Sequence, residues 1–466
     1  MRARADRLVI GLFAAFMLGP LASLAALGYD AFAERRETLR PFQAAAFVAH
    51  SDTYRGALLR EAITGSELGA ATIKWRAEVD SELFGIGSNS SVMEGLDGWL
   101  FVEDQFDGGR CRSEGRTKLG LLPVAAMGIA AEAADLEFVF SVSPDKSLVH
   151  PEHLTWRMEA LAECKRANAR LWREVAGRAG IDLVDHLNAL APPGVAPRFY
   201  ATDTHWNGYG GRLAVEQLRA RFQPPRAWSP EVFATPPLVR DLTVLLRSDA
   251  AEVGIEVANP PPLGPPVPGH TVVAHDSFYG SIIGLLPELF ASLHAHYYFA
   301  DGEEPEDLIA ALAPGTDRLV VNTVERLLFR RMERGERPFS WSGLIGRAIL
   351  ARNEAVARGC AFAPGGAVRV SAPGEPVVLP DVADSARPCL RLSGDIGGVS
   401  VALPLDVDGW DEFERGHAIE LPDAPDATDA STAIVLPSRF GGRAVRIESR
   451  SGVAVETGAL PPSGAI

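Results

Sequence analysis

Residues 137–142 read Glu-Phe-Val-Phe-Ser-Val, an apolar run of strand length that Pro144 stops. Similar short apolar runs recur later in the chain, at Gly180–Val184, Thr271–Ala274, Tyr297–Phe299 and Arg318–Val321. The stretches between them are rich in Ala, Glu and Arg and predict helices. Continuous apolar strands that alternate with helices are typical of a parallel sheet covered on both faces. The sequence therefore predicts a three-layer α/β domain, with its functional site at the carboxyl ends of the strands.

The composition is that of an ordinary globular protein. Among 466 residues, 47% are hydrophobic and 23% are charged, which excludes a wholly disordered chain or a polytopic membrane protein. Asp and Glu number 60 against 45 Lys and Arg, and the net charge of −15 argues against a nucleic-acid partner. The 4 cysteines include no CxxC pair, so we expect no thiolate metal centre.

The amino terminus predicts a membrane anchor. No charged residue occurs from Leu8 to Tyr29, and Arg2, Arg4 and Arg7 precede this run. About 20 apolar residues are enough to span a bilayer as a helix, and the basic flank is expected to stay in the cytoplasm. Residues 31–33 (Ala-Phe-Ala) read as a cleavage site but lie beyond the apolar run. The length favours an uncleaved signal anchor over residues 1–30, with export followed by cleavage as the alternative.

The carboxyl-terminal part of the chain predicts a second fold. After about Gly359 the helical pattern ends, and short alternating segments separated by Gly, Pro and Asp follow. Such a pattern is typical of a small antiparallel β-sandwich. The expected domains are therefore an anchor at 1–30, an α/β domain at 31–358 and a β-sandwich at 359–466.

The cysteines are expected to pair if the chain is exported, because an oxidising compartment permits disulfides. Four cysteines allow three connectivities. The most local of them joins Cys111 to Cys164 and Cys360 to Cys389, so that each loop stays within one predicted domain.

The first motif with chemical potential is Asp203-Thr204-His205-Trp206-Asn207-Gly208, which precedes a helical run at 212–222. A carboxylate two residues before a histidine can hold one ring nitrogen and leave the other free as a base. The positive end of the following helix would help to keep the imidazole neutral. A local hydrogen-bonded turn is the alternative interpretation of an isolated Asp-x-His.

The second motif, residues 271–278, reads Thr-Val-Val-Ala-His-Asp-Ser-Phe and places Ser277 where a buried strand turns into a helix. Such a turn exposes a hydroxyl group, and nearby amide hydrogens can stabilise an oxyanion. Alternatively, Asp276 or Ser277 could simply cap the helix. No GxSxG motif occurs, which excludes the nucleophile elbow of an α/β-hydrolase.

These motifs resemble those of the SGNH-hydrolase-like proteins of the AlgX/AlgJ alginate O-acetylation group. The resemblance rests on YATDTHWNGYG at 200–210 and HDSF at 275–278, with supporting stretches at 92–101, 143–151 and 320–326. It covers roughly residues 30–330, and the Asp-x-His motif precedes the serine, as it does in that family. One departure is His275, where the family often has a small or different residue. The carboxyl-terminal sandwich resembles the carbohydrate-binding module of AlgX by position and strand pattern alone.

The resemblance implies a catalytic triad. Ser277 corresponds to the nucleophile, His205 to the general base and Asp203 to its orienting acid, with no cofactor and no metal. The hydroxyl of Ser277 is then expected within about 2.6–3.2 Å of a ring nitrogen of His205, or somewhat further away in the free protein. Candidate substrate-binding residues are Lys146, Trp206, Tyr279 and Trp410.

The resemblance also implies a function, namely transfer of an acetyl group through an acetyl-serine onto hydroxyls of an exported polysaccharide. The expected partners are that polysaccharide and a membrane-bound acyltransferase that supplies the acetyl group. The protein is then expected in the periplasm, anchored to the inner membrane. The alternatives are a carbohydrate acetylesterase with the same triad and a non-catalytic glycan-binding protein of an envelope export complex.

Overall fold

The computed structural model describes most of the chain after residue 90. Described residues are 91–225, 228–246, 250–298, 305–313, 315–333, 341–362, 368–370, 375–382, 386–394, 399–403, 419–420, 430–448 and 453–461. Contacts divide the chain into two units, residues 1–94 with 242–250 and residues 95–241 with 251–466. The structure discussed below belongs to the second unit, except for β1 (Val92–Glu94) and residues 242–245 of α11 (Asp241–Leu245).

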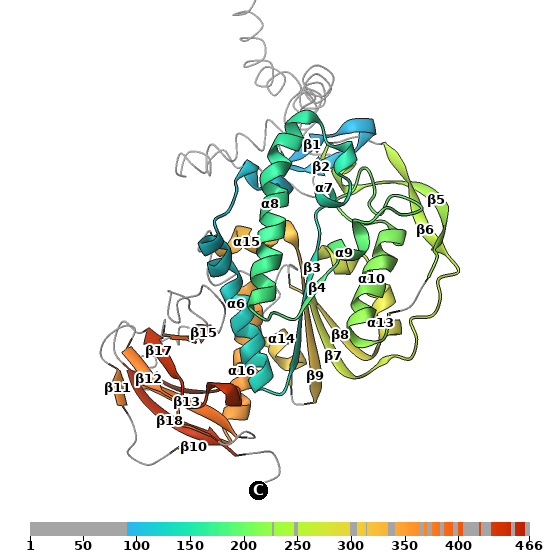
Figure 1. Cartoon of the computed structure of the whole chain (residues 1–466). Helices are drawn as coiled ribbons and strands as arrows, with labels where there is room; N and C mark the ends of the chain where they lie inside the picture. Colours follow the sequence, from blue (N-terminus) through green and yellow to red (C-terminus); the bar gives the residue numbers. More distant parts are fainter. Residues whose placement is uncertain are drawn as a thin grey trace, which may run out of the picture. The chain divides into compact units, whose positions relative to one another are not determined.

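A five-stranded parallel sheet with the order β4-β3-β9-β7-β8 forms the centre of this unit (Figure 1). Its strands are β3 (Glu137–Ser143), β4 (Leu183–Asp185), β7 (Val267–His275), β8 (Phe290–Tyr297) and β9 (Thr316–Val324). The buried runs at 137–142, 271–274 and 318–321 lie in the three inner strands, where both faces are covered. The predicted parallel α/β sheet is therefore confirmed.

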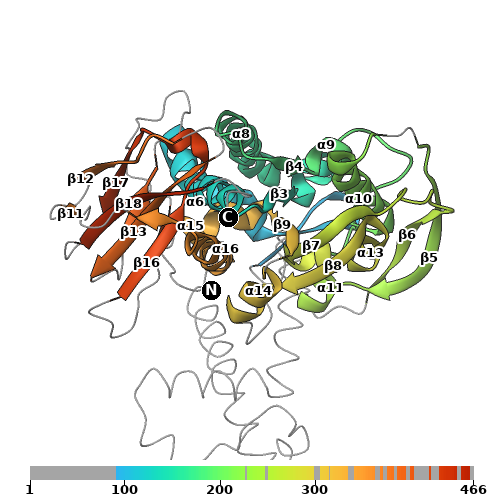
Figure 2. The same ribbon diagram turned by 90° about the horizontal axis from the view of Figure 1, so that it is seen from below.

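Helices cover both faces of the sheet, as two views of the ribbon show (Figures 1 and 2). One face carries a hydrophobic cluster to which five helices contribute. These are α6 (Glu114–Ala133), α8 (Trp156–Arg178), α14 (Pro305–Ala311), α15 (Glu325–Glu333) and α16 (Trp341–Ala357). The other face is covered by α9 (Leu187–Leu190), α10 (Gly208–Phe222) and α13 (Leu286–Leu289). Shorter helices are α7 (Lys146–Val149), α11 (Asp241–Leu245) and α12 (Ser277–Gly280), and short strands near the start are β1 (Val92–Glu94) and β2 (Leu100–Val102).

Two elements differ from the sequence prediction. The edge strand β8 runs from Phe290 to Tyr297, so it begins earlier than the strand predicted at Tyr297–Phe299, and Phe299 lies outside the described residues. The early part of β8 was missed because it is largely exposed and lacks a continuous apolar run. The antiparallel hairpin of β5 (Glu231–Val239) and β6 (Ala251–Ala258) was not predicted. β5 is mostly exposed and contains Pro236 and Pro237 at a register shift, so its sequence gives no strand signal.

Two antiparallel sheets follow α16. One has the order β10-β18-β13-β16 with β11 paired to β18, and the other has the order β12-β17-β14-β15. Their strands are β10 (Ala361–Phe362), β11 (Val368–Val370), β12 (Glu375–Val378), β13 (Arg387–Gly394), β14 (Ser400–Ala402), β15 (Ile419–Glu420), β16 (Ala430–Val435), β17 (Ala444–Glu448) and β18 (Val453–Leu460). Side chains of both sheets meet in one hydrophobic cluster, which also includes Ala126, Ile129 and Leu350 of α6 and α16.

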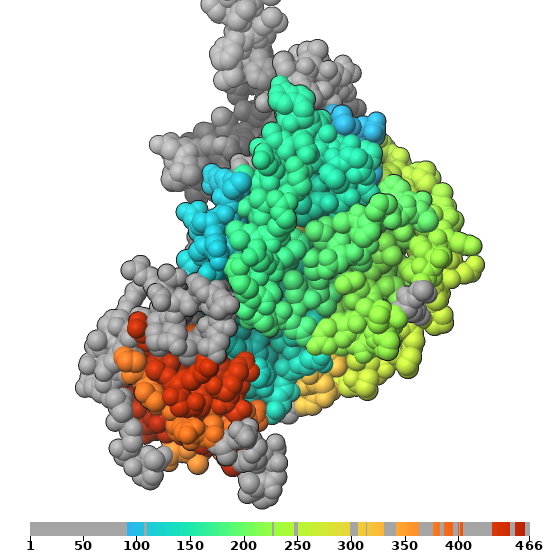
Figure 3. All heavy atoms as spheres, viewed as in Figure 1, coloured from blue at the N-terminus to red at the C-terminus, as the bar shows by residue number. Residues whose placement is uncertain are grey.

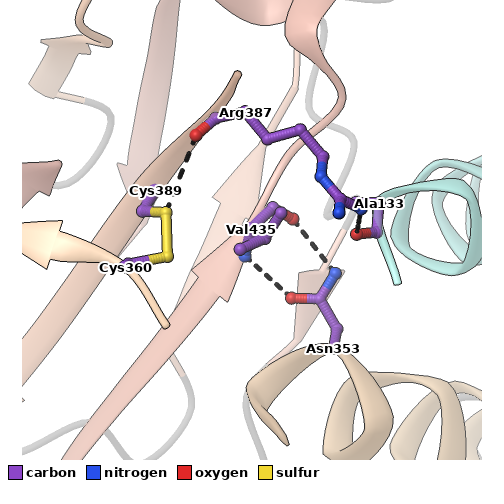
Figure 4. Close-up of a disulfide and its surroundings, with 6 residues drawn as sticks. All are labelled: Ala133, Asn353, Cys360, Arg387, Cys389 and Val435. Carbon is purple, nitrogen blue, oxygen red and sulfur yellow. Dashed lines mark hydrogen bonds between the residues drawn. A yellow bond between two sulfur atoms is a disulfide. The ribbon is translucent and has the colours of Figure 1, made fainter. Parts of the chain in front are cut away.

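Both disulfides of the most local connectivity are present. Cys111 is bonded to Cys164, and Cys360 is bonded to Cys389 (Figure 4). The second bond ties the segment that leaves α16 to β13. The predicted pairing is therefore confirmed.

The predicted anchor at residues 1–30 lies outside the described residues. Within the part of the chain that is described, no helix combines the length and the apolar character needed to cross a bilayer.

Candidate active site

Ser277 lies at the carboxyl end of β7, as the first residue of α12. The preceding residue, Asp276, is buried and caps this helix, with Oδ1 accepting from the N–H of Phe278 at 2.9 Å. Its Oδ2 accepts from the N–H of Val324 at 2.6 Å, which ties the turn to the end of β9. Asp276 therefore caps α12, and the hydroxyl of Ser277 does not take part in the cap. Since the Phe278 N–H is already used, any oxyanion donor must be a different group.

Asp203 and His205, which the sequence predicts as an acid and a base, are hydrogen-bonded to each other. Oδ1 of Asp203 accepts from His205 Nδ1 at 2.8 Å and from the His205 backbone N–H at 3.0 Å. Burial raises the pKa of Asp203, but hydrogen bonds and the charge of His205 outweigh this effect and leave the pKa below its usual value. The pattern of hydrogen bonds assigns the ring proton to Nδ1. The other nitrogen, Nε2, is thereby left with its lone pair free.

The two motifs meet through Phe278, the residue after Ser277. The rings of His205 and Phe278 have centroids 5.0 Å apart. Nε2 of His205 is buried and has no hydrogen-bond partner among the described residues, so the expected hydrogen bond to Ser277 is not formed. The structure therefore brings the His205 ring next to the residue after Ser277 and leaves its Nε2 buried and unpaired.

Lys146 supports the loop Tyr200–His205, which we call the base loop. Its side chain is 3% exposed, and Nζ donates to the carbonyls of Tyr200, Ala201 and Asp203 at 3.1, 2.9 and 2.7 Å. Burial lowers the pKa of Lys146 to about 7. Because all of these partners are backbone carbonyls, the structure places Lys146 beneath the base loop and not in the predicted substrate groove.

Two acidic residues that were not predicted hold the other side of the base loop. Glu252 accepts from the N–H groups of Ala201 and Thr202 at 2.6 and 2.8 Å. Asp241 accepts from the N–H of Thr204 at 2.8 Å and also from its hydroxyl. Glu252 belongs to β6, and Asp241 begins α11 just after β5. No local pattern marks these carboxylates in the sequence, because their partners are about 40 to 50 residues away.

Trp206 and Tyr279 are buried, in contrast to their predicted contact with substrate. Trp206 is 2% exposed and donates to Oγ of Ser281 at 2.8 Å. Tyr279 is fully buried, and its hydroxyl lies 2.8 Å from both Ser141 Oγ and His186 Nε2. Both side chains therefore fix the packing behind the serine turn. The remaining candidate, Trp410, lies outside the described residues.

Three groups at the base loop have the separation of a metal site. Asp203, His205 and Asp241 each offer one atom, and these atoms lie within 4.8 Å of one another. Hydrogen bonds already explain their closeness, because His205 Nδ1 donates to Asp203 while Asp241 accepts from Thr204. A cation bound there would have to displace the proton on Nδ1. We therefore interpret the cluster as the orienting side of a histidine base.

Part of this chain matches the model of a known protein family. Residues 92–237 match the family model described as "SGNH hydrolase-like domain, acetyltransferase AlgX". This match includes Asp203 and His205, whereas Ser277 lies beyond it.

The relatives carry the name "Probable alginate O-acetylase AlgJ". The protein of Pseudomonas syringae pv. tomato is 30% identical over 186 residues, which are 37% of this chain and 45% of that protein. The protein of Azotobacter vinelandii is 29% identical over 152 residues, which are 32% of this chain and 37% of that protein. The matched region thus spans less than half of each relative. The resemblance to the AlgX/AlgJ group is confirmed.

Solved structures from the same group are also similar to this chain. Pseudomonas aeruginosa AlgX is 13% identical and covers 79% of this chain and 94% of its own, with a TM-score of 0.38. The O-acetyltransferase domain of Pseudomonas putida AlgJ is 17% identical and covers 56% and 98%, with a TM-score of 0.36.

Proposed function

We propose that this protein is a serine-dependent O-acetyltransferase that acts on hydroxyl groups of an exported polysaccharide. The observation that carries the proposal is the Asp203–His205 hydrogen bond, which leaves Nε2 buried, unpaired and next to the residue that follows Ser277. The match of residues 92–237 to the AlgX acetyltransferase domain supports the same chemistry. The names of the relatives support a polysaccharide acceptor of the alginate type.

In the first half-reaction, His205 Nε2 accepts the proton of Ser277 as Oγ attacks the acetyl carbonyl of the donor. The bond between the carbonyl carbon and the donor oxygen breaks, and that oxygen takes the proton from His205. Asp203 stabilises the transient imidazolium through Nδ1. The products are an acetyl-serine and the deacetylated donor.

In the second half-reaction, a sugar hydroxyl gives its proton to Nε2 and attacks the acetyl-serine. The ester bond to Ser277 breaks, and Oγ recovers a proton from His205. An esterase would use water in place of the sugar, so the two activities share every step except the identity of the acceptor.

Other parts of the chain have proposed functions that follow from the same group. We propose that residues 1–30 anchor the protein in the inner membrane and that residues 31–358 form the catalytic domain in the periplasm. We propose that the two sheets of residues 359–466 are a β-sandwich that binds the glycan. A membrane-bound acyltransferase would supply the acetyl group.

The test is acetylation of Ser277 in the full chain incubated with a chromogenic acetyl ester, with and without oligosaccharide. We expect Ser277→Ala to abolish turnover, and mass spectrometry to find one acetyl group on the peptide that contains Ser277 in the wild type. Ser281→Ala is the matched control, because Ser281 has the same chemistry but its hydroxyl contacts Trp206 and Phe278. Acetylated sugar supports transfer, free acetate alone supports an esterase, and an active Ser277→Ala variant refutes the proposal.

A further inference from the structure

Asp241 places a second carboxylate beside the ring nitrogen that Asp203 orients. Its Oδ2 lies 3.7 Å from His205 Nδ1, compared with 2.8 Å for Asp203 Oδ1. The two aspartates come from different elements, since Asp203 lies in the base loop and Asp241 begins α11. His205 therefore faces two carboxylates on one side, while its free nitrogen points away from both.

Thr204 connects Asp241 to the ring. The Thr204 hydroxyl donates its proton to Asp241, and its oxygen lies 3.1 Å from His205 Nδ1. Because that hydroxyl proton is already committed, the oxygen can only accept from Nδ1–H. The ring proton is thus shared between Asp203 and Thr204, and both contacts favour the tautomer with a free Nε2.

The charges around the ring agree with this arrangement. Burial and the neighbouring charge of Asp203 raise the pKa of Asp241, as expected when two carboxylates lie close together. Asp276, at the cap of α12, interacts electrostatically with His205. The nearby cations are Lys146 beneath the base loop and Arg326 of α15, which lies over the Phe278 ring next to His205. When His205 takes a proton, the positive charge is therefore stabilised by two nearby carboxylates instead of one.

We infer that Asp241 is a positioning residue for the proposed base, holding Thr204 in place and, together with Asp203, stabilising the protonated ring of His205. The catalytic meaning of this inference rests on the proposed function. The stabilisation of the protonated His205 ring by Asp241 is a property of the folded protein. Removal of the Asp241 charge should make His205 easier to deprotonate whether or not the protein transfers acetyl groups.

The experiment is an NMR titration of His205 in the full chain with its histidines labelled at Cε1, the signal being assigned with His205→Gln. We expect Asp241→Asn to lower the midpoint of the His205 titration by roughly 0.5–1 pH unit, since the lost charge is close but partly exposed to solvent. Glu252→Gln is the matched control, because Glu252 holds the same loop through Ala201 and Thr202 without facing the ring. It should leave the midpoint almost unchanged.

A second variant tests the same inference in case Asp241→Asn does not fold. Thr204→Val removes the hydroxyl between the ring and Asp241 but keeps the Thr204 N–H bond to Asp241. We expect a smaller downward shift with a native melting temperature. Equal midpoints in the wild type, Asp241→Asn and Thr204→Val would overturn the inference.

Kinetics separate this inference from the proposed function. If the wild type transfers acetyl groups, the acidic limb of the kcat/KM profile of Asp241→Asn should move by the same amount as the NMR midpoint. If the wild type is inactive, the proposed function fails, and the NMR shift alone still supports or contradicts the assignment of Asp241.

Discussion

Asp203 and Asp276 show how hydrogen-bond partners determine the structural role and the pKa of an aspartate. Both are aspartates at the carboxyl edge of the sheet, but Asp276 accepts only from backbone N–H groups, those of Phe278 and Val324. Burial raises its pKa to about 6, while the pKa of Asp203 beside His205 is below its usual value. Asp276 therefore shapes the serine turn, and Asp203 remains a charge that can stabilise an imidazolium.

The buried histidine behind the serine turn gives a prediction about pH. His186 Nε2 lies 2.9 Å from Ser141 Oγ and 2.8 Å from Tyr279 Oη, and burial lowers the pKa of His186 to about 4. In the unfolded chain a histidine titrates near 6.5. Between these values the unfolded state binds a proton that the folded state does not, so acidification favours unfolding.

We expect the wild type to lose roughly 3 kcal/mol more unfolding free energy between pH 7 and pH 4 than His186→Gln, which lacks this proton. Urea unfolding at several pH values measures the difference. Parallel pH curves for wild type and His186→Gln would show that His186 has the same pKa in the folded and unfolded protein, and would contradict this prediction.

At the scale of elements, the base loop is held from both sides by charged side chains. Lys146 of α7 donates to three of its carbonyls, and Glu252 of β6 accepts from two of its N–H groups. The backbone N–H and C=O groups of a loop are not paired by regular hydrogen bonds, as those of a helix or strand are. In the base loop, Lys146 and Glu252 supply the missing donors and acceptors. The position of His205 therefore depends on α7 and on the β5–β6 hairpin.

Replacement of Lys146 by Met keeps the length of the side chain but leaves three carbonyls without their donor. We expect acetyl transfer to fall at least about tenfold, because small displacements of a catalytic group are costly. Hydrogen exchange, followed by mass spectrometry, should become faster in peptides covering the base loop and stay unchanged in β3. Native protection of the base loop in Lys146→Met would contradict this role.

The sequence predicted those elements whose signals are local. The inner strands are continuous apolar runs, and α10 was expected from residue 212 onward. It begins earlier, at Gly208, because Asn207 caps it by accepting from the N–H of Gly210 at 3.0 Å. Gly210 is required there, since a Cβ atom would lie 2.1 Å from the carbonyl oxygen of Arg198. A glycine-rich start gives no helical pattern, and the tertiary contact with Arg198 explains why residue 210 is a glycine.

The candidate site was predictable only in part for the same reason. Asp203, His205 and Ser277 were predicted from motifs and a family resemblance, whereas Asp241 and Glu252 contact the base loop from positions that no spacing reveals. Lys146 was noticed in the sequence, but its burial reverses the interpretation. A lysine in a loop is usually solvated, and here the carbonyls of the base loop replace the water.

At the scale of the whole unit, the carboxyl-terminal sheets are joined to the helical layer. In the space-filling view, their atoms (orange to red) adjoin the body that carries the helices (Figure 3). The shared hydrophobic cluster includes Ala126, Ile129 and Leu350 from α6 and α16. Arg387 of β13 also donates to the carbonyl of Ala133 in α6 (Figure 4). The two folds are thus expected to unfold together.

Asn353 is the polar centre of this junction. It is 1% exposed, and its amide donates to the carbonyl of Ala130 at 3.0 Å. The amide also donates to the carbonyl of Val435 at 3.0 Å, and the side-chain oxygen accepts from the Val435 N–H at 2.8 Å (Figure 4). Val435 ends β16, which is the last strand of its sheet. The side chain of Asn353 therefore pairs with this strand edge much as a neighbouring strand would.

Asn353→Ala should uncouple the two folds, because it leaves both backbone groups of Val435 buried and unpaired. We expect a loss of about 2–4 kcal/mol in unfolding free energy and a calorimetric trace that changes from one transition to two. Arg391→Gln is the matched control on the adjacent strand, since the exposed Arg391–Glu456 pair should contribute less than about 1 kcal/mol. If the proposed glycan-binding function of the carboxyl-terminal sheets is right, Asn353→Ala should also lower transfer to oligosaccharide while hydrolysis of a small acetyl ester persists below the first transition. A single transition at the wild-type temperature would mean that the apolar cluster alone couples the two folds.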